Sequence, residues 1–258
     1  MRVSTINRLL RNYGPAALLV LLVLVVWEAA VRLGHFPPFI LPAPSSVWTA
    51  LVEQRSLLFG LHLPVTLQET LLGFAASVVC GTLLGVSMHL SRPLAKAVYP
   101  LLIVSQTVPL IALSPIFIMW FGYTLWGKVA VVFLTAFFPV VVGTYDGLHK
   151  SGEQYRELLL TLGASRHQLL IKIQIPLALP AFFSGLKLSI VYCVIGATIG
   201  EWLGGSKGLG YYSRRMAGNL QSAEMFAAVC LLSALGIMLF LCIIVIEKIL
   251  LKKRGVHR

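Results

Sequence analysis

Charged residues are scarce in this sequence, and acidic residues are the scarcest. Of its 258 residues, 12% are charged and 58% are hydrophobic, whereas about 25% of the residues in a typical soluble domain are charged. The mean hydropathy is +0.87. Because so few charges cannot cover the surface of a soluble domain of this length, the composition predicts an integral membrane protein.

Cysteine is scarce as well. The four cysteines, Cys80, Cys193, Cys230 and Cys242, each lie in an apolar run, and no two of them form a C-x-x-C pair. The sequence has no N-x-S/T glycosylation acceptor. Cysteines in such surroundings are typically small packing residues. We therefore expect neither a metal site nor a disulfide framework.

A phosphate-binding loop is also missing. The segment GEWLGGSKGLG comes close, with Gly200, Gly205 and Lys207, but its lysine does not directly follow the second glycine and is not followed by Ser or Thr. A P-loop needs both features, with a strand before it and a helix after it. We expect no ATP site, no cofactor and no catalytic residue in the chain itself.

Positive charge, by contrast, is in excess, since 21 Lys and Arg against 9 Asp and Glu give a net charge of +12. The basic residues lie in loops and tails beside apolar runs, a pattern that orients membrane proteins and does not form a basic groove for nucleic acid. With the N-terminus inside, fourteen Lys and Arg fall on the inner side and six on the outer side. This bias predicts that both termini and the loop around Tyr155 are cytoplasmic.

Six apolar runs predict an all-α membrane domain of six transmembrane helices, since about 20 apolar residues cross a bilayer. More spans follow the first run, which favours a retained helix over a cleaved signal peptide. The expected spans are residues 15–31, 66–90, 97–121, 128–143, 181–199 and 223–246. We divide the chain into an N-terminal part with the first helix (1–62), a five-helix transmembrane domain (63–247) and a basic cytoplasmic tail (248–258).

Two helices carry unusual residues. In the second span, Gly81 and Gly85 form a G-x-x-x-G spacing, which either permits close helix contact or reflects the composition of membrane helices. The third span has polar groups and prolines at mid-membrane depth. These residues include Ser105, Gln106, Thr107, Pro109 and Ser114.

Polar groups persist inside a bilayer where they face protein or a watery cavity. We therefore expect the third span to line a transport pathway, with polar contacts between helices as the alternative. Glu201, at the outer end of the fifth span, is either a gate residue of this pathway or a solvated charge at the interface.

A long polar insert has the pattern of two short helices that meet at a corner. The first helix, residues 153–162, has one apolar face. Gly163 suits the left-handed position after the last helical residue, and Ser165 with Gln168 forms the capping box of a second helix. We expect this second helix to end at Pro176.

The same insert resembles the EAA loop of permease subunits in binding-protein-dependent ABC importers. The match consists of Glu157, Gly163 after five residues, Ile173 after nine more and Pro176 at the end. Two leucines replace the alanines of the motif, and Ile175 replaces its leucine. These departures affect the detail of docking more than the assignment.

The resemblance implies a type I ABC importer permease fold with a cytoplasmic coupling loop at residues 144–175. In that family the loop forms a coupling helix that sits in a groove of a separate ATPase subunit, which binds the ATP. The residues expected to couple to the ATPase are Tyr155, Arg156, Glu157, Gly163, Ala164, Arg166, Ile173 and Pro176. Further implied partners are an extracytoplasmic solute-binding protein and a second copy of the permease, in a bacterial plasma (inner) membrane.

Segments outside the loop narrow the resemblance to one branch. LPAPSSV, SQTVPLIALSPIFIMWFG, FFPVVVGTYDGL and GEWLGGSKGLGYY are similar to segments of the nitrate, sulfonate and taurine branch. The second and fourth of them are most similar to permeases for the pyrimidine precursor of thiamine. The resemblance implies import of a small polar, anionic or heterocyclic solute, and leaves open which of these it is.

Two other classes of membrane protein fit the sequence less well. A secondary transporter or channel that works without ATP normally needs an ionisable residue near the bilayer midplane, and the carboxylates of this chain fall in loops or near span ends. An intramembrane enzyme needs a nucleophile and a base at one depth. His89, His149 and His167 all fall on the cytoplasmic side without an obvious catalytic partner.

Overall fold

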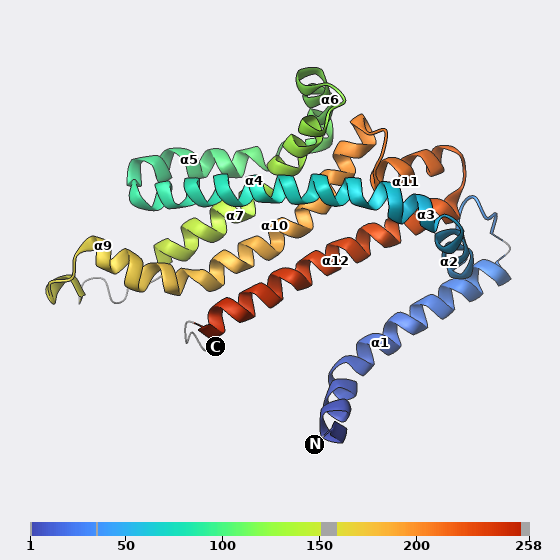
Figure 1. Cartoon of the computed structure of the whole chain (residues 1–258), viewed down its shortest axis with the longest axis horizontal. Coiled ribbons are helices and arrows are strands. Elements are labelled where there is room, and N and C mark those ends of the chain that lie inside the picture. The colour runs from blue at the N-terminus through green and yellow to red at the C-terminus, as the bar shows by residue number, and fades with distance from the viewer. Residues whose placement is uncertain (1, 35, 151–158, 254–258) are drawn as a thin grey trace.

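A computed structural model describes residues 2–34, 36–150 and 159–253 of the chain (Figure 1). The described part is built from helices and contains no strand. Five helical segments are long and apolar enough to cross a membrane, and a bent helix pair brings the number of spans to as many as six. The prediction of an all-α membrane fold is confirmed.

The helices have the following bounds, with π-helical turns labelled η. In chain order they are α1 (Arg2–Leu33), α2 (Pro44–Glu53), α3 (Arg55–Leu57), η1 (Leu58–His62), α4 (Leu63–Leu90), α5 (Arg92–Ser105), α6 (Leu110–Phe121), α7 (Leu125–Lys150), α9 (Arg166–Leu169), η2 (Leu170–Gln174), α10 (Ile175–Gly204), α11 (Leu209–Gly218) and α12 (Ser222–Lys253).

Helix α7 packs closely against both α4 and α10 because small residues line the two contacts. A Cβ added at Gly81 or Gly85 of α4 would lie 2.8 or 2.7 Å from a side-chain carbon of α7. On α10, a Cβ at Gly185 would lie 2.5 Å from the carbonyl oxygen of Pro139 in α7. The G-x-x-x-G spacing therefore marks a true packing contact, in which close backbones gain dispersion energy that lipid does not compete for.

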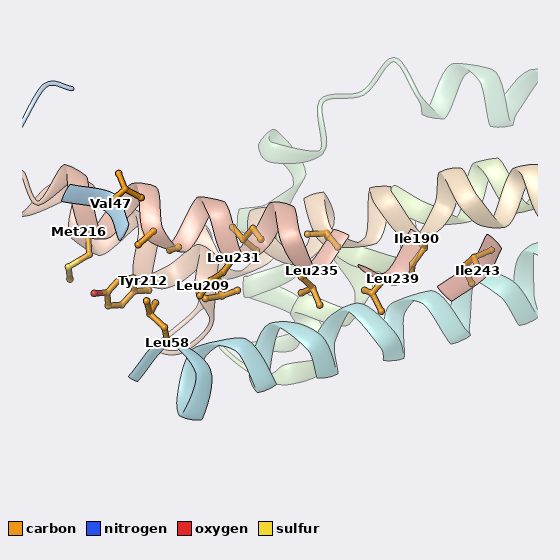
Figure 2. Packing of buried hydrophobic residues seen from close by; sticks show 14 of the residues in the cluster. Val47, Leu58, Ile190, Leu209, Tyr212, Met216, Leu231, Leu235, Leu239 and Ile243 are labelled. Carbon is orange, nitrogen blue, oxygen red and sulfur yellow. The ribbon is translucent and has the colours of Figure 1, made fainter. Parts of the chain in front are cut away.

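Larger side chains fill the space around α12 (Figure 2). They come from α2, η1, α10, α11 and α12, and several are fully buried. The labelled members of this cluster are Val47, Leu58, Ile190, Leu209, Tyr212, Met216, Leu231, Leu235, Leu239 and Ile243. The cluster holds the short helices α2 and α11 against the start of α12, at the end of the molecule opposite α9 (Figure 1).

The third predicted span is not a single helix. It is a pair, α5 and α6, whose axes differ by 89°. Pro109 has no N–H for a helical hydrogen bond and disfavours helical geometry at Val108. The hydroxyls of Ser105 and Thr107 donate to the carbonyls of Leu102 and Val104, both at 2.7 Å. The expectation of one continuous helix over residues 97–121 is therefore wrong.

The helix that begins after the corner does not end at Pro176, as the sequence had suggested. Helix α9 passes through the π-helical turn η2 directly into α10, so that residues 166–204 form one continuous span. The wider turn places Pro176 in the first turn of α10, where a proline needs no N–H donor. The fifth span is consequently longer at both ends than the predicted 181–199.

Helix α1 contacts the rest of the chain mainly at its C-terminal end, where Val31 is the buried residue of the candidate span Gly14–Leu33. Glu28 accepts hydrogen bonds there from the backbone N–H and the hydroxyl of Ser45, at 3.0 and 2.8 Å. Arg32 donates to the same carboxylate at 2.6 Å. These bonds fix the end of α1 to the start of α2.

Candidate functional site

The corner at Gly163 has the backbone geometry that the sequence predicted. Gly163 has a φ of +85°. Its N–H donates to the carbonyl of Leu160 at 3.0 Å, and the N–H of Ala164 donates to that of Leu159 at 2.9 Å. This pair of bonds is a Schellman motif, which ends a helix in a sharp turn and satisfies its last carbonyls. The left-handed residue is thus required by the turn itself.

The second side of the corner begins with a complete capping box. Ser165 Oγ accepts from the N–H of Gln168 at 3.2 Å, and Gln168 Oε1 accepts from the N–H of Ser165 at 3.0 Å. Arg166 and His167 are exposed in the first turn of α9. Two motifs back to back therefore fix the angle between the chain segments on either side of the corner.

The other residues expected to couple to an ATPase are placed as follows. Tyr155, Arg156 and Glu157 lie outside the residues that the structure describes. Ile173 is half-buried in η2, and Pro176 is half-buried at the start of α10. Next to Ile173, the side chain of Gln174 is 3.2 Å from Nε2 of His89 in α4. This contact links the base of the corner to the end of a second membrane helix.

The corner projects from the helical bundle and is exposed. In Figure 1, α9 lies at the extreme end of the molecule, away from α2, α3 and α11. Leu162 is 73% exposed, although it is apolar. An exposed leucine beside basic side chains on a rigid turn is typical of a surface that binds another protein.

The residues predicted to line a pathway do not form one group. Ser105, Gln106, Thr107 and Pro109 are exposed and lie at the break between α5 and α6. The side chain of Ser114 lies outside the described part of the chain. Glu201 is at the end of α10 and is fully buried. The break and Glu201 are therefore two separate features.

Glu201 is held by donors from two segments. Its Oε1 accepts from the hydroxyl of Thr66 at 2.6 Å, and its Oε2 accepts from the N–H groups of Gly210 at 2.5 Å and Tyr211 at 3.3 Å. Gly208, with a φ of +115°, is so close that an added Cβ would lie 2.1 Å from the Glu201 carboxyl carbon. The interpretation of Glu201 as a solvated interface charge is wrong, since the carboxylate anchors the first turn of α11.

Sequence reasoning missed the residues around Glu201. His62 Nδ1 accepts from the N–H of Gly208 at 3.0 Å, Thr66 Oγ1 accepts from that of Leu209 at 2.8 Å, and Glu69 forms an ion pair with Lys128. His62, Thr66 and Glu69 are spaced i, i+4 and i+7. This spacing puts all three on one helix face, a signal that could have been read before the structure.

The described residues contain no group of three or more His, Cys, Asp or Glu side chains placed to hold a metal ion. The two features offer two kinds of interaction. The corner offers an exposed surface to a partner, and the Glu201 cluster offers buried hydrogen bonds that join helices.

Comparison with known proteins places the chain in a family. A model of the family described as "Binding-protein-dependent transport system inner membrane component" matches residues 77–254. The formylaminopyrimidine transport permease protein ThiX of Halalkalibacterium halodurans is 45% identical over 235 residues, which are 91% of this chain and 93% of that protein. The riboflavin transport system permease protein RibX of Chloroflexus aurantiacus is 33% identical, covering 97% of this chain and 96% of that one.

Less similar proteins are also ABC transporter components. The putative aliphatic sulfonates transport permease protein SsuC of Bacillus subtilis is 29% identical over 95% of this chain and 90% of its own length. The fold is similar to that of a chain in the inward-facing MetNI methionine ABC transporter, with a TM-score of 0.60 and 20% identity over 75% of this chain and 94% of that one. The chain belongs to the family of inner membrane components of binding-protein-dependent transport systems, the ABC importer permeases.

Proposed function

We propose that this chain is the membrane-spanning subunit of an ATP-driven importer, and that the corner at Gly163 is where a separate ATPase subunit docks. The observation that supports this most is the corner itself, in which a Schellman motif and a capping box lie back to back on an exposed projection. A turn that hydrogen bonds fix on both sides can transmit a displacement of the partner to the adjoining membrane helices without bending. A flexible loop would change its own conformation and transmit little of the same displacement.

A displacement of the corner would be transmitted directly to the membrane helices. Helix α9, the turn η2 and α10 are continuous, so a displacement of the corner moves the base of α10 as well. The Gln174 contact with His89 extends the route to α4. The segment from Tyr155 to Pro176 that resembles the EAA loop is then the coupling element, and the ATP is bound by the partner.

The remaining parts of the proposal follow from family membership and charge. The excess of Lys and Arg on one side supports cytoplasmic termini and a cytoplasmic corner. A second copy of the permease would complete the route, and an extracytoplasmic binding protein would deliver the solute to the end that carries α2 and α11. Polar groups at the break between α5 and α6 are proposed to line that route.

For the solute we propose a formylaminopyrimidine or a close pyrimidine relative. The support is the 45% identity, over nearly the whole of both chains, to a permease named for that compound. Relatives named for riboflavin and aliphatic sulfonates are less similar, at 33% and 29% identity.

Competition for uptake tests the solute. Proteoliposomes that contain the permease, its ATPase and its binding protein should accumulate labelled formylaminopyrimidine with ATP inside. Excess unlabelled formylaminopyrimidine should abolish this uptake, whereas taurine, an alkanesulfonate, nitrate and riboflavin should leave most of it. Efficient uptake of one of these four solutes, with none of the pyrimidine, would contradict the assignment.

A further inference from the structure

The connection between the first two candidate spans carries large apolar side chains that the described part of the chain leaves exposed. The spans are Gly14–Leu33 and Arg55–Leu90, so residues 34–54 connect them, with α2 at the end of this connection. Trp48 of α2 is 68% exposed. The other large apolar side chains exposed here are Phe36, Phe39, Ile40 and Val52. So many exposed apolar groups in one short connection indicate contact with a partner or with lipid.

The side chains of α2 form three stripes along the helix. Val47 and Ala50, three residues apart, are buried in the apolar cluster around α12. Trp48 and Val52, four residues apart, form an exposed apolar stripe. The third stripe is polar and exposed, and consists of Ser46, Thr49 and Glu53. Residues three or four apart lie on the same face of a helix, so α2 has one face against the protein, one apolar exposed face and one polar exposed face.

The apolar stripe continues the exposed apolar surface of α1. Ser45 is bonded through its N–H and its hydroxyl to Glu28, near the end of α1. Ser45 borders the apolar stripe, because Trp48 and Val52 follow it three and seven residues later. On α1 itself, residues 15–26 are all exposed. Where α1 crosses a membrane, its apolar surface therefore extends onto α2.

Helix α2 also begins at the depth where α1 leaves the membrane (Figure 1). The candidate span of α1 has 20 residues, enough to cross about 30 Å of hydrocarbon at about 1.5 Å per residue. Leu33 therefore lies near the bilayer surface. Ser45 lies near it too, because its partner Glu28 comes only five residues before Leu33. Tryptophan is enriched at this level of a membrane, since its ring is apolar and its indole N–H can bond to headgroups or water.

The separation of the two exposed stripes favours lipid over a soluble protein. A soluble protein that covered α2 from the aqueous side would bring the apolar and the polar stripe under one interface. A bilayer surface has an apolar side and an aqueous side at the same level, and α2 offers one stripe to each. This division is typical of helices that lie in the plane of a membrane surface.

We propose that α2 binds the bilayer surface as an interfacial helix, with Trp48 and Val52 in contact with lipid and the polar stripe in water. Its buried face, Val47 and Ala50, belongs to the same apolar cluster as residues of α11 and α12. Contact with lipid therefore fixes the level of α11 and of the start of α12 relative to the membrane. The proposal does not depend on which solute is transported.

Spin labels on the two exposed stripes test this proposal. The four cysteines of the chain are replaced by alanine, and single cysteines are introduced in the apolar stripe by Trp48→Cys and Val52→Cys. The matched controls on the same helix are Ser46→Cys, Thr49→Cys and Glu53→Cys. In lipid nanodiscs that contain the permease and its ATPase, labels at positions 48 and 52 should collide mainly with oxygen, which concentrates in hydrocarbon. The control labels should collide mainly with a water-soluble nickel chelate.

Tryptophan fluorescence gives a second readout that leaves the cysteines in place. The emission of Trp48 is the difference between the spectra of the unchanged protein and of Trp48→Phe. Phosphatidylcholine brominated near the headgroup should quench this emission at least twofold more strongly than phosphatidylcholine brominated near the end of the acyl chain. Iodide in the water should quench it weakly.

The proposal is overturned if labels at positions 48 and 52 collide with the nickel chelate as often as the control labels do. Loss of those collisions on addition of the binding protein would assign the apolar stripe to that protein instead. Labels that reach neither reagent, with spectra broadened by a label on another chain, would assign it to a second copy of the permease. If the chain without cysteines does not fold, the fluorescence decides, and Trp48 emission that no brominated lipid quenches contradicts the proposal.

Discussion

Replacing Gly163 by valine is expected to reduce ATP-driven uptake by about tenfold or more while the protein still inserts into the membrane. The φ of Gly163 is +85°, and within the described part of the chain a Cβ added there would meet no atom beyond its chain neighbours within 4 Å. The substitution therefore acts through backbone strain, about 1–2 kcal/mol for an L-residue in the left-handed region. Strain of this size shifts a conformational equilibrium about tenfold, and the chain can relieve it only by changing the angle of the corner.

A second substitution at the same position separates strain from loss of the glycine as such. Asparagine adopts the left-handed region far more readily than a β-branched residue, so Gly163→Asn should keep most of the uptake that Gly163→Val loses. Both variants should reach the membrane in normal amounts, as judged by quantitative blotting of membrane fractions. Equal uptake by the valine variant and the unchanged protein would show that the corner geometry has no part in coupling.

Replacing Gly208 by alanine should have the largest effect on stability. Gly208 has a φ of +115°, and its Cβ would lie 2.1 Å from the Glu201 carboxyl carbon and 2.2 Å from Oε1. Steric overpacking costs about 1–3 kcal/mol. With ψ at 161° the backbone of Gly208 lies in a region that essentially only glycine adopts, and its strain adds about 1–3 kcal/mol. We expect the thermal midpoint to fall by roughly 6 °C or more, measured on purified protein in nanodiscs.

Gly218 is the matched control, at the other end of α11. Among the described residues a Cβ there meets nothing within 4 Å, and the glycine does not have a positive φ. Gly218→Ala should therefore leave the thermal midpoint nearly unchanged. If Gly208→Ala were as stable as this control, Glu201 would not be anchoring the first turn of α11 as the hydrogen bonds indicate.

The geometry of the corner at Gly163 could be predicted from local backbone rules. Gly163 after the last helical residue, and Ser165 with Gln168, belong to motifs that depend on three to six neighbouring residues. Tertiary packing does not need to be known for such motifs, so their geometry could be predicted correctly. The G-x-x-x-G spacing of Gly81 and Gly85 left two interpretations open, close helix contact or membrane-helix composition, and only the position of the partner helix decides between them.

The sequence did not predict which prolines break a helix, because the outcome depends on packing around each proline. Pro109 breaks the third span, whereas Pro100, Pro115, Pro139 and Pro180 remain inside helices. Sequence gives the same local penalty for all of them, and the outcome depends on whether neighbours or a wider π-helical turn can satisfy the freed carbonyl. The ends of spans were therefore less predictable than their centres.

The cluster around Glu201 could be predicted only in part. His62, Thr66 and Glu69 share a helix face by their spacing, but Lys128 and the Gly208–Gly210 turn come from segments that are distant in sequence. Their meeting depends on how α4, α7 and α10 pack, which periodicity does not specify. Charged groups near span ends are usually solvated or snorkel to the interface, and burial of both glutamates departs from that rule.

Dependence of transport on ATP and on a separate ATPase is the most direct test of the account. The permease should be reconstituted in proteoliposomes alone, with the ATPase, and with the ATPase and the binding protein, with solute outside and ATP inside. We predict accumulation of the solute only in the complete system with ATP, and no ATP hydrolysis by the permease alone. Uptake against a gradient, or ATP turnover at the rate of the complete system, by the permease alone would contradict the account.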